Sequence, residues 1–303
     1  MLQKYWDIFL NGYTGFANHI WKELTFQYDP WWHNYTWMLI GISAIFFGLE
    51  ILAPWRKDQP RFRKDFWLDF VYMFFNFSLF WLVIYAAASD VGVELFRKFL
   101  GLFGVQNLVA DWVIALPVGL HLLLGFVLRD FVQWWTHRLL HRVPFLWEFH
   151  KVHHSVEQMG FAAHLRFHWM ETVVYRTIEY IPLAMIGIGL NDFFAIHIFT
   201  LVIGHMNHSN LNVSYGPLKY IFNNPKMHIW HHAYSLPNER RFGANFAITL
   251  SIWDYLFGTA YIPKDGRDIR LGFAGIKQFP KTFWGQLVHG LFPKRQRSTG
   301  DNS

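Results

Sequence analysis

The sequence predicts an all-α protein, a polytopic membrane helical bundle of about four to five membrane segments with a cytoplasmic helical cap. Of its 303 residues, 53% are hydrophobic and only 16% are charged, which is too apolar for an ordinary soluble domain. Several apolar runs reach the roughly 20 residues that a helix needs to cross the hydrocarbon of a bilayer. Histidines gather between and after these runs, so the cap is predicted to hold a histidine-rich dimetal site.

The first part of the chain is predicted to hold an interfacial segment, residues 1–34, followed by transmembrane helices within residues 35–136. Three apolar runs define these helices, at residues 35–54, 66–88 and 113–131. Residues 89–103 have a helical apolar face and are predicted to lie in the opposite membrane interface.

The second part is predicted to alternate between histidine regions and membrane. Residues 137–172 form a first histidine region and residues 207–293 a second. Between them, residues 173–206 are apolar but are broken by the sequence GIGLND, which favours a helical hairpin over one straight helix. Residues 294–303 form a basic and polar tail.

Charge predicts the orientation in the membrane. The loop between the first two apolar runs, WRKDQPRFRKD, holds five basic and two acidic residues, a net charge of +3. Loops enriched in Lys and Arg stay on the cytoplasmic side. Counting crossings from this loop, the histidine regions and the basic tail also fall on the cytoplasmic side, provided that the hairpin returns.

Composition excludes several classes of function. The chain has no cysteine, so it forms no disulfide, thiolate zinc site or iron–sulfur cluster. Its net charge of +6 is explained by basic cytoplasmic loops, and we expect no nucleic-acid partner. The first 16 residues lack an apolar core followed by a small-residue cleavage site, so no removable signal peptide is predicted.

Histidine clusters are the most informative feature. Of 17 histidines, 13 fall between His137 and His232. Two histidines four residues apart on a helix share one face, as a common metal ion requires. The H-x-x-H-H spacing occurs twice, and the candidate ligands are His137, His141, His150, His153, His154, His205, His208, His228, His231 and His232.

The other histidines are interpreted differently. His164 and His168 are expected to support ligands or structure, and His197 is set aside. Four isolated histidines are expected to be ordinary core or interface residues, namely His19, His33, His121 and His289. Asp254 is expected either to support a ligand histidine or to cap a turn. Trp134 and Trp135 are interpreted as an interfacial aromatic belt or as the lining of a lipid path.

The number of candidate ligands points to two metal ions. A structural zinc site needs four ligands and a catalytic one three, whereas two ions with four or five imidazoles each account for all candidates. Imidazole binds iron, zinc, copper and nickel alike, so spacing does not choose the metal. A zinc-dependent membrane hydrolase stays an alternative. A metal transporter or sensor is disfavoured because transport places ligands within the spans.

Four segments resemble the fatty acid hydroxylase/sterol desaturase superfamily. They are THRLLHRVPFLWEFHKVHHS, NHSN, NNPKMHIWHH and IWDYLFGT, in the order of the family. The chain departs from the family where R-x-H-P-x-E is usual, because it reads Arg166-Phe-His168-Trp-Met-Glu171, and it has Asn245-Phe246-Ala247 in place of N-[FY]-G.

This resemblance implies a non-haem di-iron oxygenase. The family's ligands fall on the ten candidate histidines, with two Fe ions as cofactor and O2 as co-substrate. The implied reaction is hydroxylation, or desaturation, of a membrane lipid such as a fatty acyl chain or sterol. The chain has no recognisable electron-transfer domain, so the resemblance implies a separate donor protein, cytochrome b5-like or ferredoxin-like.

Overall fold

The computed structural model describes residues 2–76, 80, 86–105, 113, 115–186 and 190–291. Within these residues the protein is helical and has no β-strand, only isolated β-bridges, so the predicted all-α class is confirmed. The α-helices are α1 (Leu2–Leu24), α2 (Tyr35–Leu52), α3 (Phe66–Phe74), α4 (Ala86–Gly101), α6 (Val118–Arg142), α7 (Pro144–His154), α8 (Trp169–Ile186), α9 (Leu190–His208), α10 (Pro225–His231), α11 (Ile252–Leu256) and α12 (Phe283–Leu287). Short 3₁₀ helices are η1 (Trp31–His33), η4 (Phe161–Leu165), η5 (Gly216–Tyr220), η6 (Asn238–Arg240) and η7 (Ile276–Gln278).

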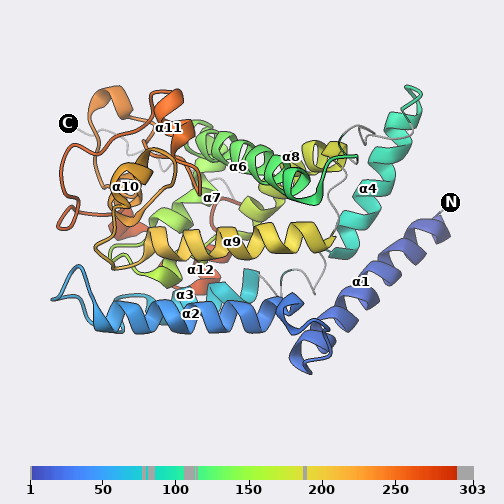
Figure 1. Ribbon diagram of the computed structural model, residues 1–303, viewed down its shortest axis with the longest axis horizontal. Helices are drawn as coiled ribbons and strands as arrows, with labels where there is room; N and C mark the ends of the chain where they lie inside the picture. Colours follow the sequence, from blue (N-terminus) through green and yellow to red (C-terminus); the bar gives the residue numbers. More distant parts are fainter. Residues whose placement is uncertain are drawn as a thin grey trace, which may run out of the picture.

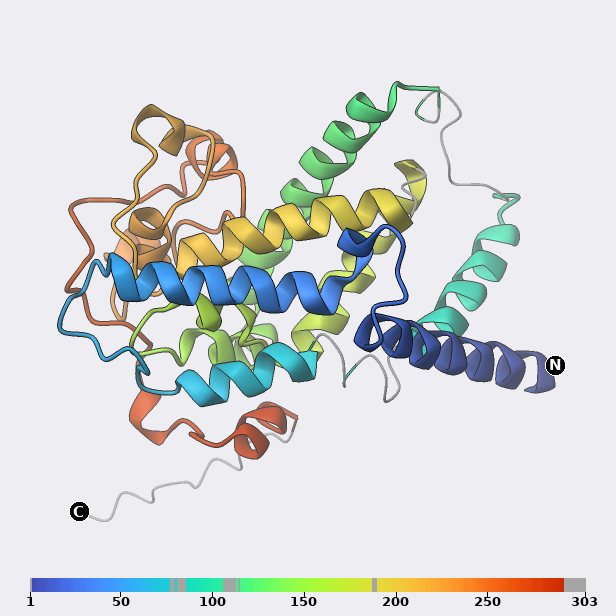
Figure 2. The same ribbon diagram turned by 60° about the horizontal axis from the view of Figure 1, so that its bottom comes forward.

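The long helices form a bundle with an irregular region at one end. Helix α6 packs against α7 and α8, and α9 packs against α2, α10 and η4. The loops and short helices around α10 and α11 gather at one end of the bundle, at the left of Figure 1, whereas α12 packs against α3. Helices α1 and α4 pack against each other and project from the opposite end (Figures 1 and 2).

Local sequence explains where the helices around the histidines begin and end. Pro144 is the first residue of α7 and has no amide hydrogen to lose there, so the chain turns at Val143 directly from α6 into α7. Helix α10 also begins with a proline, Pro225, and the Asn224 side chain caps it by accepting a hydrogen bond from Met227 N. Each H-x-x-H-H motif therefore lies on a short helix that begins with proline.

A hydrophobic core joins α2, α3, η4 and α9. Its buried members include Leu39, Phe46, Phe66 and Phe161. Beside this core, the Glu50 carboxylate accepts hydrogen bonds from Phe161 N and Asn210 N, at 2.8 and 2.7 Å. The end of α2 is thereby tied to both segments that carry the histidine motifs.

One helix within the described residues, α2, is long and apolar enough to cross a membrane by length and composition. The apolar runs predicted at residues 66–88 and 113–131 lie partly outside the described residues. The predicted hairpin corresponds to two helices, since α8 ends at Ile186 and α9 begins at Leu190. Helix α8 leads away from the first histidine region and α9 returns to the second (Figures 1 and 2).

Candidate metal centre

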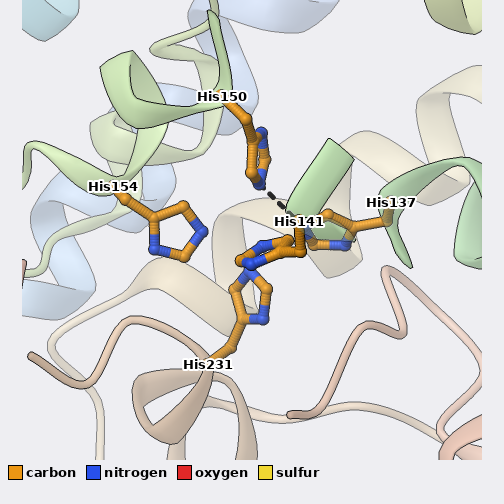
Figure 3. Close-up of side chains that lie close together, drawn as sticks. All are labelled: His137, His141, His150, His154 and His231. Carbon is orange, nitrogen blue, oxygen red and sulfur yellow. Dashed lines mark hydrogen bonds between the residues drawn. The ribbon is translucent and has the colours of Figure 1, made fainter. Parts of the chain in front are cut away.

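Nine of the ten candidate ligands converge in two groups. The five-histidine group contains His137, His141, His150, His154 and His231. The four-histidine group contains His153, His208, His228 and His232. Within each group, one nitrogen from every ring lies within 4.8 Å of the others. Figure 3 shows the rings of the five-histidine group turned toward one another from α6, α7 and α10.

Neighbouring histidines serve different groups. Successive residues of an α-helix point about 100° apart, whereas residues four apart share a face. His153 therefore joins the four-histidine group while His154 joins the other, and His231 and His232 divide in the same way. Each H-x-x-H-H motif thus contributes to both groups, which places the two groups side by side.

The second ring nitrogen of several histidines is held by a fixed acceptor. Backbone carbonyls accept hydrogen bonds from Nδ1 of His137, His231 and His208, at 2.7, 2.8 and 2.8 Å. The carbonyls belong to Phe246, Ala244 and Gly204. A bond at Nδ1 fixes the tautomer and leaves the Nε2 lone pair free for a metal ion.

The remaining nitrogens fit metal ions. A metal–imidazole bond is about 2.0–2.1 Å long, so two nitrogens on one ion lie about 3.0–3.4 Å apart. The Nε2 atoms of His137 and His150 are 3.0 Å apart, and Nε2 of His228 lies 2.9 Å from that of His208 and 3.2 Å from that of His232. Nε2 of His141, His154 and His231 is buried without a hydrogen-bond partner among the described residues.

The electrostatics of the site favour neutral imidazoles. Burial lowers the pKa of His137 to about 4 and lowers the pKa values of the other eight grouped histidines well below the usual range. For these eight histidines, neighbouring imidazoles lower the pKa further, because like charges repel. Neutral rings present the lone pairs that a metal ion needs.

Glu171 supports the five-histidine group. Its Oε1 atom lies 3.0 Å from His150 Nδ1, and both side chains are buried. Burial raises the pKa of Glu171 well above its usual range, while a cation nearby would favour the carboxylate. A carboxylate behind a ligand histidine orients the ring and increases its basicity. In the sequence, Glu171 stands only in the segment that departs from the family motif, and no spacing pattern indicates its role.

Asp254 acts on His137 through the backbone. Its carboxylate accepts hydrogen bonds from the amides of Phe246 and Ala247, both at 2.9 Å, and from Trp134 Nε1 at 3.0 Å. The Phe246 carbonyl in turn accepts the bond from His137. Trp134 is only 1% exposed and does not line the cavity described below, whereas Trp135 is exposed.

His205 lies outside both groups. Its Nδ1 atom is 3.0 Å from His164 Nδ1, and its Nε2 atom is 3.0 Å from Ser43 Oγ on α2. His164 reaches closer to the metal centre, with its ring centroid 5.2 Å from that of His208. His168 is also outside both groups, buried beside Phe149.

A cavity of about 150 Å³ opens beside the two groups. Histidines of both groups line it, including His137, His150, His153, His208 and His228. From these rings the cavity extends between α6, α8 and α9, where Arg129, Glu179 and His197 lie. The metal centre therefore has an adjoining space in which a substrate can lie.

The segment that carries the histidines is similar in sequence to known lipid hydroxylases and monooxygenases. Residues 122–259 match the family model described as fatty acid hydroxylase. The chain is 34% identical to an ornithine lipid hydroxylase of Rhizobium tropici, over 61% of this chain and 55% of the relative. It is 34% identical to human alkylglycerol monooxygenase over 45% of this chain and 29% of the relative.

A third relative is a very-long-chain aldehyde decarbonylase of Oryza sativa subsp. japonica, 28% identical over 46% of this chain and 45% of the relative. The chain thus spans about half the length of the bacterial relative and less than a third of the human one. No solved structure matches the chain. The matched residues 122–259 include all nine grouped histidines. The resemblance to the fatty acid hydroxylase family that the histidine motifs predict is therefore confirmed for this part of the chain.

Proposed function

We propose that the protein is an integral-membrane, non-haem di-iron oxygenase that hydroxylates, or desaturates, a membrane lipid. The observation that carries this proposal is the convergence of nine imidazoles, eight of them buried and that of His141 partly buried, into two neighbouring groups beside one cavity. The names of two relatives, an ornithine lipid hydroxylase and an alkylglycerol monooxygenase, support oxygenation of a lipid.

The proposed ligands are the nine grouped histidines, one metal ion to each group. Such a pair of irons supplies the activation of O2 for attack on an unactivated C–H bond. In hydroxylation, one oxygen atom enters the C–H bond as C–OH and the other leaves as water, with two electrons and two protons consumed. The protein holds the ligands through backbone carbonyls and Glu171, and the side chains of α6, α8 and α9 line the reaction space.

The two electrons are proposed to come from a separate donor protein, cytochrome b5-like or ferredoxin-like. The lipid is proposed to enter from the bilayer, with the histidine groups on the cytoplasmic side of a multi-pass bundle. Within this arrangement residues 35–136 and 173–206 provide the membrane segments, and residues 137–172 and 207–293 form the cap. The +3 charge of the loop after α2 supports this orientation.

Metal content tests the function directly. Protein purified from cells supplied with iron should contain about two iron atoms per chain, because each group offers at least four nitrogen ligands. It should form an oxygenated lipid only with O2 and a reductant. A single zinc per chain with negligible iron, and activity without O2, would instead favour the zinc-dependent hydrolase.

The orientation is testable because the natural chain contains no cysteine. Single cysteines placed at exposed positions report which side of the membrane each position faces. D58C and E239C should react with a membrane-impermeant thiol reagent only from the cytoplasmic side. L102C, in the segment after α4, should react from the other side. Labelling of all three from one side would overturn the proposed topology.

A further inference from the structure

The cavity beside the histidine groups contains several buried oxygen acceptors. Asn76, Asn207 and Glu179 line it and are at most 3% exposed. Oδ1 of each asparagine and Oε1 of Glu179 have no hydrogen-bond partner among the described residues. Gln133, one turn from His137 on α6, lines the same cavity and has an unpartnered Oε1 atom. A buried acceptor without a partner costs about 1–3 kcal/mol, so a cluster of them indicates a missing donor.

The orientation of these acceptors follows from their other contacts. Asn76 donates through Nδ2 to the carbonyls of Leu165 and Phe167, at 3.2 and 3.0 Å. Asn207 donates through Nδ2 to the Ile248 carbonyl at 2.7 Å. Because a carbonyl only accepts, each amide must keep its nitrogen on that side and its oxygen on the other.

Charged side chains in the cavity balance one another. Arg129 and Arg176 both lie near Glu179, with nitrogens 4.0 and 3.5 Å from its Oε2 atom. Glu171 provides a second carboxyl group to the lining. Two guanidinium and two carboxyl groups suit a polar ligand without net charge better than a simple anion. Arg129, Arg176 and Glu179 belong to predicted membrane segments, where ionisable residues indicate a functional site.

The size of the cavity limits what it holds. Its volume is about 150 Å³, and a cavity of about this volume accommodates one molecule of benzene in an apolar protein core. From Glu171 to Glu179 it follows two turns of α8, a rise of about 12 Å. This space fits a small polar moiety and is too short for the whole acyl chain of a membrane lipid.

We propose that this cavity binds the headgroup of the lipid, a small zwitterionic or hydroxyl-rich group that donates hydrogen bonds to Glu179, Gln133, Asn76 and Asn207. The inference rests on the proposed oxygenase and narrows its substrate. Because the cavity reaches the rings of both histidine groups, the C–H bond that receives oxygen lies in the headgroup or within a few bonds of it. The acyl chain then extends away from the metal centre.

Three probes with the same decyl chain test the headgroup site: N-decanoyl-ornithine, a decyl glycerol ether and decanoate. The metal-loaded full chain in detergent is heated with each probe, and the oxygen position in any product is mapped by mass spectrometry. We expect the first or second probe to raise the melting temperature and decanoate to leave it unchanged. E179Q and Q133L should abolish most of that shift, whereas E239Q, at an exposed position, should keep it.

The melting temperature without a probe shows whether each variant is folded. Equal stabilisation by decanoate, or oxygen inserted at the far end of the decyl chain, would overturn the headgroup site. A shift that E179Q and Q133L both retain while folded would also overturn it. Binding of the ornithine or glycerol probe with no oxygenated product under O2 and reductant would leave the headgroup site standing and count against the oxygenase.

Discussion

The two histidine groups differ in how the fold supports them. The five-histidine group is anchored by the Phe246 and Ala244 carbonyls and by Glu171, which belong to the loop after α10 and to α8. The four-histidine group is anchored by the Gly204 carbonyl within α9 and more weakly by the Arg166 carbonyl, 3.3 Å from His153 Nδ1, and the Asn223 amide nitrogen, 3.4 Å from His228 Nδ1. The anchors of the five-histidine group thus lie at 2.7–3.0 Å and include a carboxyl group, whereas two of the three anchors of the four-histidine group lie at 3.3 Å or more.

The two groups also differ in their number of ligands, which affects how tightly each group holds a metal ion. A group with five ligands keeps a full tetrahedral set after it loses one, whereas a group with four falls to three. The cavity is lined by two members of the five-histidine group and three of the four-histidine group. The four-histidine group is therefore expected to hold its metal ion less tightly and to be more open to the substrate.

The largest effect is expected from replacing adjacent histidines that serve different groups. H153A should lower iron to about one atom per chain, because only three imidazoles remain in its group, while H154A should retain more. H153A should also reduce product formation by at least about 100-fold, since the reaction needs both ions, whereas H154A should reduce it less. Metal analysis and lipid product assays measure the two effects.

H33A provides a matched control, because His33 lies in η1 and outside both groups. It should keep about two irons per chain and wild-type activity. If H153A and H154A lose iron equally, the four-histidine group binds its iron as tightly as the five-histidine group does. Full retention of iron by either variant would remove that histidine from the proposed ligands.

Glu171 offers the next largest effect and concerns the five-histidine group alone. E171Q keeps the shape of the side chain but removes the charge that orients His150. Loss of such a supporting carboxylate costs about 10–100-fold in metal affinity or activity. Chelator titration should show that one iron is bound more weakly than in the wild type and that the affinity for the other iron is unchanged. Equal weakening of both would mean that Glu171 does not act through His150.

Spacing identifies the nine histidines that converge, but not their division into two groups. The pair His137 and His141 and the two H-x-x-H-H motifs correctly indicated which segments meet, because helical spacing is local. The assignment of His153 and His154 to different groups follows from helix geometry only once the position of α10 is known. Glu171 and the Phe246 carbonyl are brought to the histidines by tertiary packing, which no local pattern encodes.

A comparison of Asp254 with Asp130 separates a smaller effect on iron binding from an effect on the stability of the fold. Asp254 holds the amides of Phe246 and Ala247, whereas Asp130 holds those of Thr249 and Leu250, at 3.2 and 3.0 Å. D254N and D130N should both lower the melting temperature, since each disturbs buried hydrogen bonds worth about 1–3 kcal/mol. Only D254N should also weaken iron binding, by up to about 10-fold, because Phe246 orients His137.

The proposed role of Asp254 is contradicted if D130N weakens iron binding as much as D254N does. The loss would then reflect the general stability of the loop that both aspartates hold. Iron affinity measured well below the melting temperature of each variant, on protein of matched folded fraction, distinguishes the two explanations. Wild-type iron affinity in folded D254N would mean that the Phe246 carbonyl needs no support from Asp254.

The smallest effect is expected at His205, which the histidine pattern predicts as a ligand. Its two ring nitrogens face Ser43 and His164 rather than the four-histidine group. H205A should therefore keep about two irons per chain and lose only a few-fold in activity, through displacement of His164 beside His208. H208A, one helical turn away, should instead lose the iron of its group. Loss of one iron in H205A would show that His205 turns to bind metal and is a fifth ligand of the four-histidine group. The two groups would then have the same number of ligands.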